Sequence, residues 1–187
     1  MPHRTLVDLG FCAGSGVRLC PRSELHPRTT VPDPAWAPLQ QPFVRPRPEG
    51  AAAEMFREWS ANTGPGSVGF SVCSLATDEL VGHATLYGAA LPWRAGTLAI
   101  LLGPDFTDRG LGTDAVRTLV RYGFLEMALN QIELRVWAFN ARARRAYAKA
   151  GFVEEGVRRQ VVFHDGEFHD EVIMAVLAAE WRAAQPS

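Results

Sequence analysis

The 187-residue sequence has little excess charge, few cysteines and no long apolar run. Its 19 basic residues nearly balance 20 acidic ones, so no overall positive field draws the chain to nucleic acid or to anionic lipid. The apolar stretches are far shorter than the roughly 20 residues of a transmembrane helix, and the N-terminus lacks a basic region followed by an apolar core. We therefore expect a cytoplasmic protein that binds neither nucleic acid nor membrane.

The three cysteines, Cys12, Cys20 and Cys73, are an odd number without a Cys-x-x-Cys pair or a neighbouring group of histidines. This spacing argues against a disulfide framework and a zinc site, so we expect buried or idle thiols and no bound metal. Apolar residues make up 47% of the chain and charged residues 21%, which is ordinary globular usage and excludes a disordered or fibrous class. A chain of this length fits one domain.

Residues 1–16 are loop-like, and we expect them to be an N-terminal extension to a single domain that spans 17–187. Prolines recur every few positions over 21–48, which argues against a long regular helix there. No pattern assigns this segment a structure or a role. Apolar residues at helical spacing then predict a helix over 49–62, which a following Asn-Thr-Gly-Pro run ends.

The remaining sequence alternates strand-like and helix-like patterns. The predicted strands are 17–20, 68–75, 80–87, 97–102, 132–137, 152–163 and 168–177, and the last two flank an Asp-Gly pair typical of a hairpin turn. The 97–102 run is apolar throughout, as in a central strand covered on both faces. Apolar residues three and four apart predict helices over 110–128 and 141–150. This order indicates an α+β domain with a mixed sheet.

The strand ending at Leu102 leads through a tight loop into the 110–128 helix. Gly110 and Gly112 lie in the first turn of this helix, where free backbone N–H groups and the positive end of the helix dipole favour an anion. The loop lacks the later acidic residue of a dinucleotide site and the Lys-Ser/Thr of a P-loop. A Gly-x-Gly pair alone is more often a tight strand-to-helix turn than a nucleotide site.

Two longer runs carry a family resemblance. Residues 103–115, Gly-Pro-x-Phe-x-x-x-Gly-x-Gly-Thr-x-Ala, resemble the pyrophosphate loop of GNAT superfamily acetyltransferases, particularly the ribosomal-protein alanine acetyltransferase-like branch. The second run is similar to the superfamily's Asn/Tyr helix and its Lys-x-Gly-Phe end, with matches at Asn140, Tyr147, Lys149, Gly151 and Phe152. Thr107 departs from the Gln or Arg of the family motif, and Arg109 is a candidate to replace that side-chain contact.

The resemblance implies a GNAT-type twisted mixed sheet of about seven strands, flanked by helices and splayed between strands four and five. It further implies that acetyl-CoA enters this opening and that its acetyl group passes directly to a primary amine in a ternary complex. The implied cofactor-binding residues are Ile100, Leu101, Leu102, Thr107, Asp108, Arg109, Gly110, Leu111, Gly112, Thr113, Asn140 and Tyr147.

Asn140 and Tyr147 share a helix face because they are seven residues apart. In the implied reaction, Asn140 holds the pantetheine arm, Tyr147 gives a proton to the departing thiolate, and a backbone N–H of strand 100–102 stabilises the oxyanion. Each residue also has a purely structural interpretation, Asn140 as a helix N-cap and Tyr147 as a core aromatic.

The general base is left open. Glu133 is one candidate catalytic residue, and His83, His164, His169 and Asp170 are others, although each is also typical of a solvated or cross-strand position. A base acting through water, or solvent alone, fits equally. Four cations could attract the 3′-phosphate of coenzyme A or simply line an exposed helix face: Arg142, Arg144, Arg145 and Lys149.

The acceptor amine is also open, among protein N-termini, antibiotic amino groups, amino acids and polyamines. No acidic cluster is evident in the sequence, which favours acceptors other than polyamines and aminoglycosides. Trp36, Trp59 and Trp93 are candidates to line the acceptor pocket or to lie in the core. The alternative function is a non-catalytic acyl-CoA-binding or sensing module, and the chain is either a monomer or a homodimer.

Overall fold

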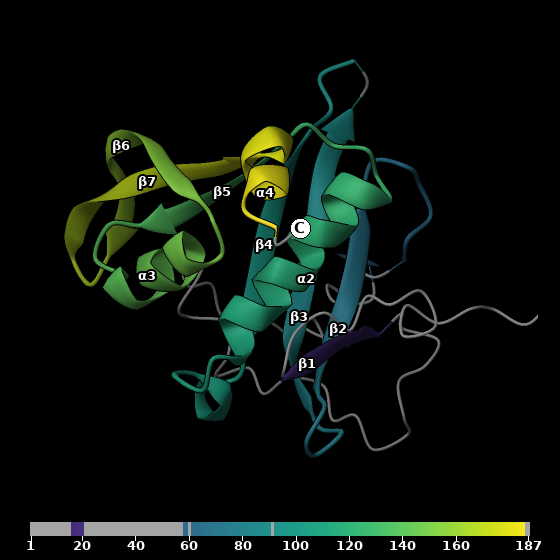
Figure 1. Ribbon diagram of the computed structural model, residues 1–187. Coiled ribbons are helices and arrows are strands. Elements are labelled where there is room, and N and C mark those ends of the chain that lie inside the picture. The colour runs from purple at the N-terminus through teal and green to yellow at the C-terminus, as the bar shows by residue number, and fades with distance from the viewer. Residues whose placement is uncertain (1–15, 21–57, 60, 91, 186–187) are drawn as a thin grey trace, which may run out of the picture.

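The computed structural model describes residues 16–20, 58–59, 61–90 and 92–185. The proline-rich segment 21–48, Cys12, Trp36 and most of the helix predicted over 49–62 lie outside these residues. Glu58 and Trp59, at the end of that helix, are helical. The described strands form one seven-stranded sheet in the order β1-β2-β3-β4-β5-β7-β6, with helices against it (Figure 1).

The seven strands are β1 (Val17–Cys20), β2 (Val68–Ser74), β3 (Leu80–Ala90), β4 (Ala95–Leu102), β5 (Gln131–Trp137), β6 (Val153–His164) and β7 (Glu167–Leu177). The helices are the 3₁₀ turn η4 (Pro104–Phe106), α2 (Leu111–Leu125), α3 (Ala141–Lys149) and α4 (Ala178–Ala183). The predicted strands and the predicted helices over 110–128 and 141–150 are confirmed. Asp165 and Gly166 both have positive φ, 50° and 82°, as a tight hairpin turn between β6 and β7 requires.

The sheet is mixed because β4 and β5 run parallel, whereas every other neighbouring pair of described strands is antiparallel. Their register runs from Ala95 opposite Gln131 to Thr97 opposite Glu133. Beyond Thr97, β4 pairs with β3 through Leu102, whereas β5 pairs with β7 through Trp137. The predicted opening between strands four and five is therefore confirmed, and it lies at the C-terminal ends of both strands.

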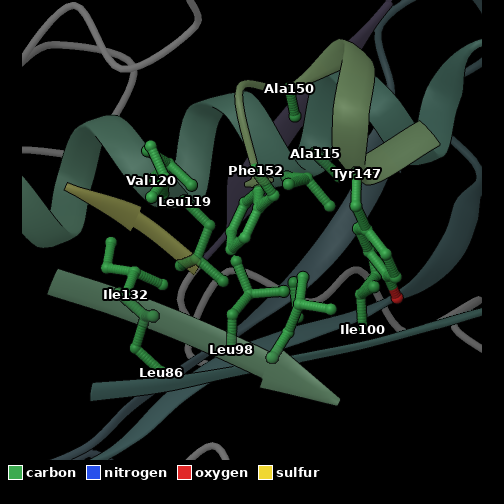
Figure 2. Packing of buried hydrophobic residues seen from close by; sticks show 14 of the residues in the cluster. Leu86, Leu98, Ile100, Ala115, Leu119, Val120, Ile132, Tyr147, Ala150 and Phe152 are labelled. Carbon is green, nitrogen blue, oxygen red and sulfur yellow. The ribbon is translucent and has the colours of Figure 1, made fainter. Parts of the chain in front are cut away.

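The main core lies between the sheet and the helices. Leu86, Leu98 and Ile132 project from three neighbouring strands toward α2, whose Leu119 and Val120 are fully buried (Figure 2). Gly123 allows the close approach of helix and sheet, since a Cβ there would lie 2.8 Å from Cδ1 of Ile132. The apolar face predicted for this helix is thus the face that positions it, and with it the loop that precedes it.

Two short helices were missed by the sequence patterns. Pro104 begins η4, whose three residues are too few to show a period. The second, α4, directly follows β7, and the Glu180 carboxylate accepts a hydrogen bond from the Leu177 N–H at 3.1 Å. Its Trp181 packs against Phe124 of α2, with ring centroids 5.5 Å apart. Among the described residues, no helix is long and apolar enough to span a bilayer.

Candidate functional site

A cavity of about 350 Å³ opens where β4 leaves its pairing with β5. The end of β4, the η4 loop, the first turn of α2 and one face of α3 surround it. Its lining residues are Ile100, Leu101, Leu102, Pro104, Phe106, Thr107, Asp108, Gly110, Gly112, Thr113, Val116, Asn140, Arg142, Ala143, Arg145, Ala146, Tyr147 and Lys149. Two segments that are separate in sequence, 100–116 and 140–149, therefore meet at one site.

The loop before α2 is shaped by two left-handed residues. Asp108 has a φ of 57°, and Gly110, the N-cap of α2, has a φ of 80°. No Cβ contact would arise at Gly110 within 4 Å, so its requirement for glycine comes from the backbone conformation rather than from space. The helix beyond it begins with backbone N–H groups that have no preceding turn to bond, and these border the cavity.

The Thr107 side chain contributes to the loop itself, because its hydroxyl donates to the carbonyl oxygen of Pro104 at 2.8 Å. Arg109, the candidate substitute for the family's side-chain contact, does not line the cavity and lies 5.9 Å above the ring centre of Phe106. Leu111, the other expected cofactor residue outside the lining, is buried in the main core.

Three of the four predicted cations line the cavity, namely Arg142, Arg145 and Lys149. Arg142 also lies 3.4 Å from the Asp108 carboxylate across the mouth. The fourth, Arg144, points elsewhere, since its guanidinium binds the Glu154 carboxylate at 2.9 and 2.6 Å. The structure therefore separates the four α3 cations into three that line the cavity and one, Arg144, that binds β6.

Asn140 is the N-cap of α3, as its structural interpretation predicts, since its Oδ1 accepts the Ala143 N–H at 3.1 Å. It also lines the cavity. The two roles are compatible because the cap occupies the amide oxygen, whereas the amide nitrogen carries two further donors. These donors suit a carbonyl group of a ligand.

Tyr147 lies two turns after Asn140 on the same face of α3 and packs beside Ile100, with its hydroxyl at the edge of the buried cluster (Figure 2). The side chain is 9% exposed, and its ring is 6.1 Å from that of Phe152. Burial raises the pKa of Tyr147 to about 12. The phenol therefore keeps its proton at neutral pH and can donate a hydrogen bond to a bound group.

Glu133 lies at the closed end of the splay, opposite Thr97 in the short β4–β5 register. Its carboxylate accepts a hydrogen bond from the Thr97 hydroxyl at 3.3 Å and is 4.0 Å from Arg135. The residue does not line the cavity. This position allows Glu133 to support the strand pairing directly.

The other base candidates lie outside the cavity lining. His83 is 6% exposed in β3 with Trp59 packed 6.0 Å away, and burial lowers its pKa to about 4, so it is neutral at pH 7. The Asp170 carboxylate accepts the Gln160 N–H at 2.9 Å. His164 and His169 lie together beside the β6–β7 turn. Among the described residues, no group of three or more His, Cys, Asp or Glu side chains could hold a metal ion.

Five lining residues were not expected from the sequence: Pro104, Phe106, Val116, Ala143 and Ala146. Helical spacing could have identified three of them, since Val116 follows Gly112 by one turn and the two alanines lie on the face of α3 that carries Asn140 and Tyr147. The small side chains of Ala143 and Ala146 leave room for a ligand. Trp93, a candidate for the acceptor pocket, lies instead in a separate hollow with Phe124 and Leu129.

Two proteins that are similar in sequence are named as N-acetyltransferases. The chain is 31% identical over 112 residues to the probable N-acetyltransferase YjcK of Bacillus subtilis, covering 58% of this chain and 60% of that protein. It is 29% identical over 103 residues to the putative ribosomal N-acetyltransferase YdaF of the same organism, covering 55% and 56% of the two chains. The matches thus span little more than half the length of these relatives.

Solved structures agree in fold. The spermidine N-acetyltransferase from Vibrio cholerae in complex with CoA and spermine superposes with a TM-score of 0.66 at 22% identity, covering 74% of this chain and 81% of that one. A model of the GNAT acetyltransferase domain matches residues 23–153, well over half of the sequence. Together with the splayed sheet and the glycine loop at its opening, this match shows that the chain belongs to the GNAT acetyltransferase family.

Proposed function

We propose that the protein is an N-acetyltransferase that moves an acetyl group from acetyl-CoA to a primary amine by direct attack in a ternary complex. The single observation that carries this proposal is the meeting of the Gly110 loop, Asn140 and Tyr147 around one cavity at the open end of β4. One cavity thus offers main-chain donors for a pyrophosphate, an amide for a pantetheine arm and a protonated phenol for a thiolate.

The proposed phosphate end of the site is the first turn of α2. Backbone N–H groups from Gly110 onward and the helix dipole favour the pyrophosphate. Arg142, Arg145 and Lys149 would attract the separate 3′-phosphate of the nucleotide, since all three line the same cavity. The relatives' names and the CoA complex of the Vibrio cholerae enzyme support this assignment of the ligand.

In the proposed reaction, the amine nitrogen attacks the thioester carbonyl carbon, and a backbone N–H of the Ile100–Leu102 segment stabilises the oxyanion. The carbon–sulfur bond then breaks, and the electron pair stays on sulfur. Tyr147 donates a hydrogen bond or its proton to that sulfur, and a phenolate so formed regains a proton from solvent. The ammonium proton passes to a base or to water. No acyl-enzyme forms, so no nucleophilic side chain is required.

The test has two stages. Isothermal titration with CoA and acetyl-CoA should give micromolar binding, and a thiol-release assay over peptides, arylalkylamines, polyamines and aminoglycosides should then show turnover with one amine class. Binding without release on any amine would favour a non-catalytic acyl-CoA sensor. Absence of binding would contradict both functions and would indicate that Thr107 and Asp108 make the loop unsuitable for a pyrophosphate.

A further inference from the structure

Four aromatic rings gather where β5 ends, and we refer to them as the ring cluster: Trp137, Phe139, His164 and His169. Their closest centroids, those of Phe139 and His169, are 4.8 Å apart, and Phe139 stacks on His164 at 5.4 Å with an interplanar angle of 19°. Trp137 lies 5.2 Å from Phe139 and 5.4 Å from His164. The cluster joins the β5–α3 loop to the β6–β7 hairpin.

The ring cluster lies on the sheet face opposite the helices. Val136 belongs to the main core between the sheet and the helices, so the next residue, Trp137, points to the other face. In the neighbouring strand, Glu171 pairs with Trp137, and His169 lies two residues before it on the same face. Tyr147, in contrast, belongs to the main core on the helix side.

The cluster also adjoins the cavity. Phe139 immediately precedes Asn140, which lines the cavity, and the Asn140 N–H donates to the Trp137 carbonyl oxygen at 2.9 Å. A thioester held in the splay would therefore have Tyr147 on one side and the ring cluster on the other. Because the cofactor would fill the helix side, the opposite face is left for an approaching amine.

The composition of this surface selects among amines. Phe139 is 46% exposed, and a half-exposed aromatic ring beside a cavity suits contact with another flat or apolar group. Two nearby carboxylates are engaged, since Glu171 binds Arg158 at 2.8 Å and Asp170 accepts the Gln160 N–H. Glu167, opposite His164 at the hairpin turn, is exposed. The ring faces themselves carry no charge, so they suit an aromatic or apolar group better than the several cations of a polyamine.

His169 adds a defined polar atom. Its Nε2 lies 3.2 Å from the carbonyl oxygen of His164, which can only accept a hydrogen bond. Nε2 therefore carries the hydrogen, and in the neutral ring Nδ1 keeps its lone pair. This lone pair can accept an N–H of a bound amine.

We propose that the ring cluster is the acceptor subsite and that it takes a primary monoamine with an aromatic ring a few bonds from the nitrogen. This inference rests on the proposed acetyl transfer and names its substrate class. The same chemistry occurs in a small arylalkylamine and in a peptide whose N-terminal residue is aromatic.

The experiment compares kcat/KM for 2-phenylethylamine, a tripeptide beginning with phenylalanine, and spermidine, each with saturating acetyl-CoA. Phe139→Ala should lower kcat/KM for the aromatic amines about 10-fold, the loss expected from one aromatic contact, and leave CoA affinity unchanged. Phe168→Ala is the matched control, because this 64% exposed ring lies on the same hairpin next to His169 but on the opposite face. It should behave as wild type.

The two aromatic probes distinguish the source of the ring, since the better one identifies a small amine or a peptide. Preference for spermidine, or equal effects of Phe139→Ala and Phe168→Ala, would overturn the inference while leaving acetyl transfer intact. Titration of 2-phenylethylamine into the CoA complex gives a readout that needs no turnover. Binding that Phe139→Ala weakens would support the subsite, and absence of binding would count against it.

Discussion

On the helix side of the splay, two short segments, 100–116 and 140–149, supply all the cavity lining. On the opposite face, the ring cluster draws its side chains from the end of β5 and from both sides of the β6–β7 turn. Main-chain donors recognise a phosphate whatever side chains surround them. The rings on the hairpin can be substituted without disturbing the backbone of the Gly110 loop. In the proposed function, the recognition of acetyl-CoA and the recognition of the amine can therefore vary independently.

The largest effect should follow from Tyr147→Phe, which keeps the buried ring and removes the hydroxyl. Turnover at saturating substrates should fall at least about 10-fold, the scale for losing a general acid, because the departing sulfur loses its donor. CoA affinity by titration should stay near wild type. Tyr87→Phe, in a 46% exposed side chain of β3, is the control. Full turnover by Tyr147→Phe would remove this hydroxyl from the reaction.

Gly110→Ala should weaken CoA binding about 5-fold, because a side chain at a φ of 80° is strained by about 1 kcal/mol and the loop would shift to relieve it. Gly166→Ala is a matched control, since Gly166 has a φ of 82° in the β6–β7 turn and equally open surroundings. Both variants should lose similar thermal stability. If both also bound CoA alike, the Gly110 loop would not be the phosphate cradle.

Arg145→Gln should reduce CoA affinity about 3-fold at low salt, since one exposed cation contributes modestly and is screened by ions. The neighbouring variant Arg144→Gln should leave CoA affinity unchanged, because that guanidinium binds Glu154 rather than facing the cavity. Titration at two salt concentrations measures both. A larger loss in Arg144→Gln than in Arg145→Gln would contradict the division of the α3 cations.

The smallest effect at neutral pH concerns β3, where His83 is buried and neutral. Its pKa of about 4 in the fold lies below the ordinary 6.5, so the unfolded chain takes up the proton first as pH falls. The contribution of neutral His83 to stability should therefore be fully present above pH 6.5 and be lost toward pH 4, by about 3 kcal/mol at most. Between pH 7.5 and 4.5, the melting temperature of His83→Gln should fall less steeply than that of the wild type. Parallel curves for the two proteins would show that protonation of His83 does not cause the loss of stability.

Patterns that are local in sequence predicted most of the fold. The strands, the helices over 110–128 and 141–150, and the Asp165-Gly166 turn each depend on periodicity or turn residues within a few positions. The 3₁₀ turn at Pro104 and the six-residue α4 were missed because neither is long enough to show a period. The opening between β4 and β5 was implied by family resemblance, since a register depends on distant partners.

The candidate site likewise combines features that local sequence predicts with features that depend on contacts between distant residues. Ten of the predicted cofactor residues line the cavity because they lie on one loop, one strand end and one helix face. The sequence could not show that Arg144 points away from the cavity that Arg145 lines, because Arg144 binds Glu154 of β6 and that contact forms only in the folded chain. Phe139 belongs to no motif, and its contacts with His164 and His169 arise only when the hairpin folds against the loop that holds it.

The short β4–β5 register has a consequence for stability. From Leu98 onward, the β4 edge that faces β5 lacks the strand partner that it has up to Thr97, so its peptide groups there are available to a ligand. If the amides of CoA occupy that edge, the ligand completes the sheet and binds the folded state alone. At 100 times its dissociation constant, such a ligand would stabilise the fold by about 2.7 kcal/mol. The thermal stability of the chain would then report the supply of its own co-substrate.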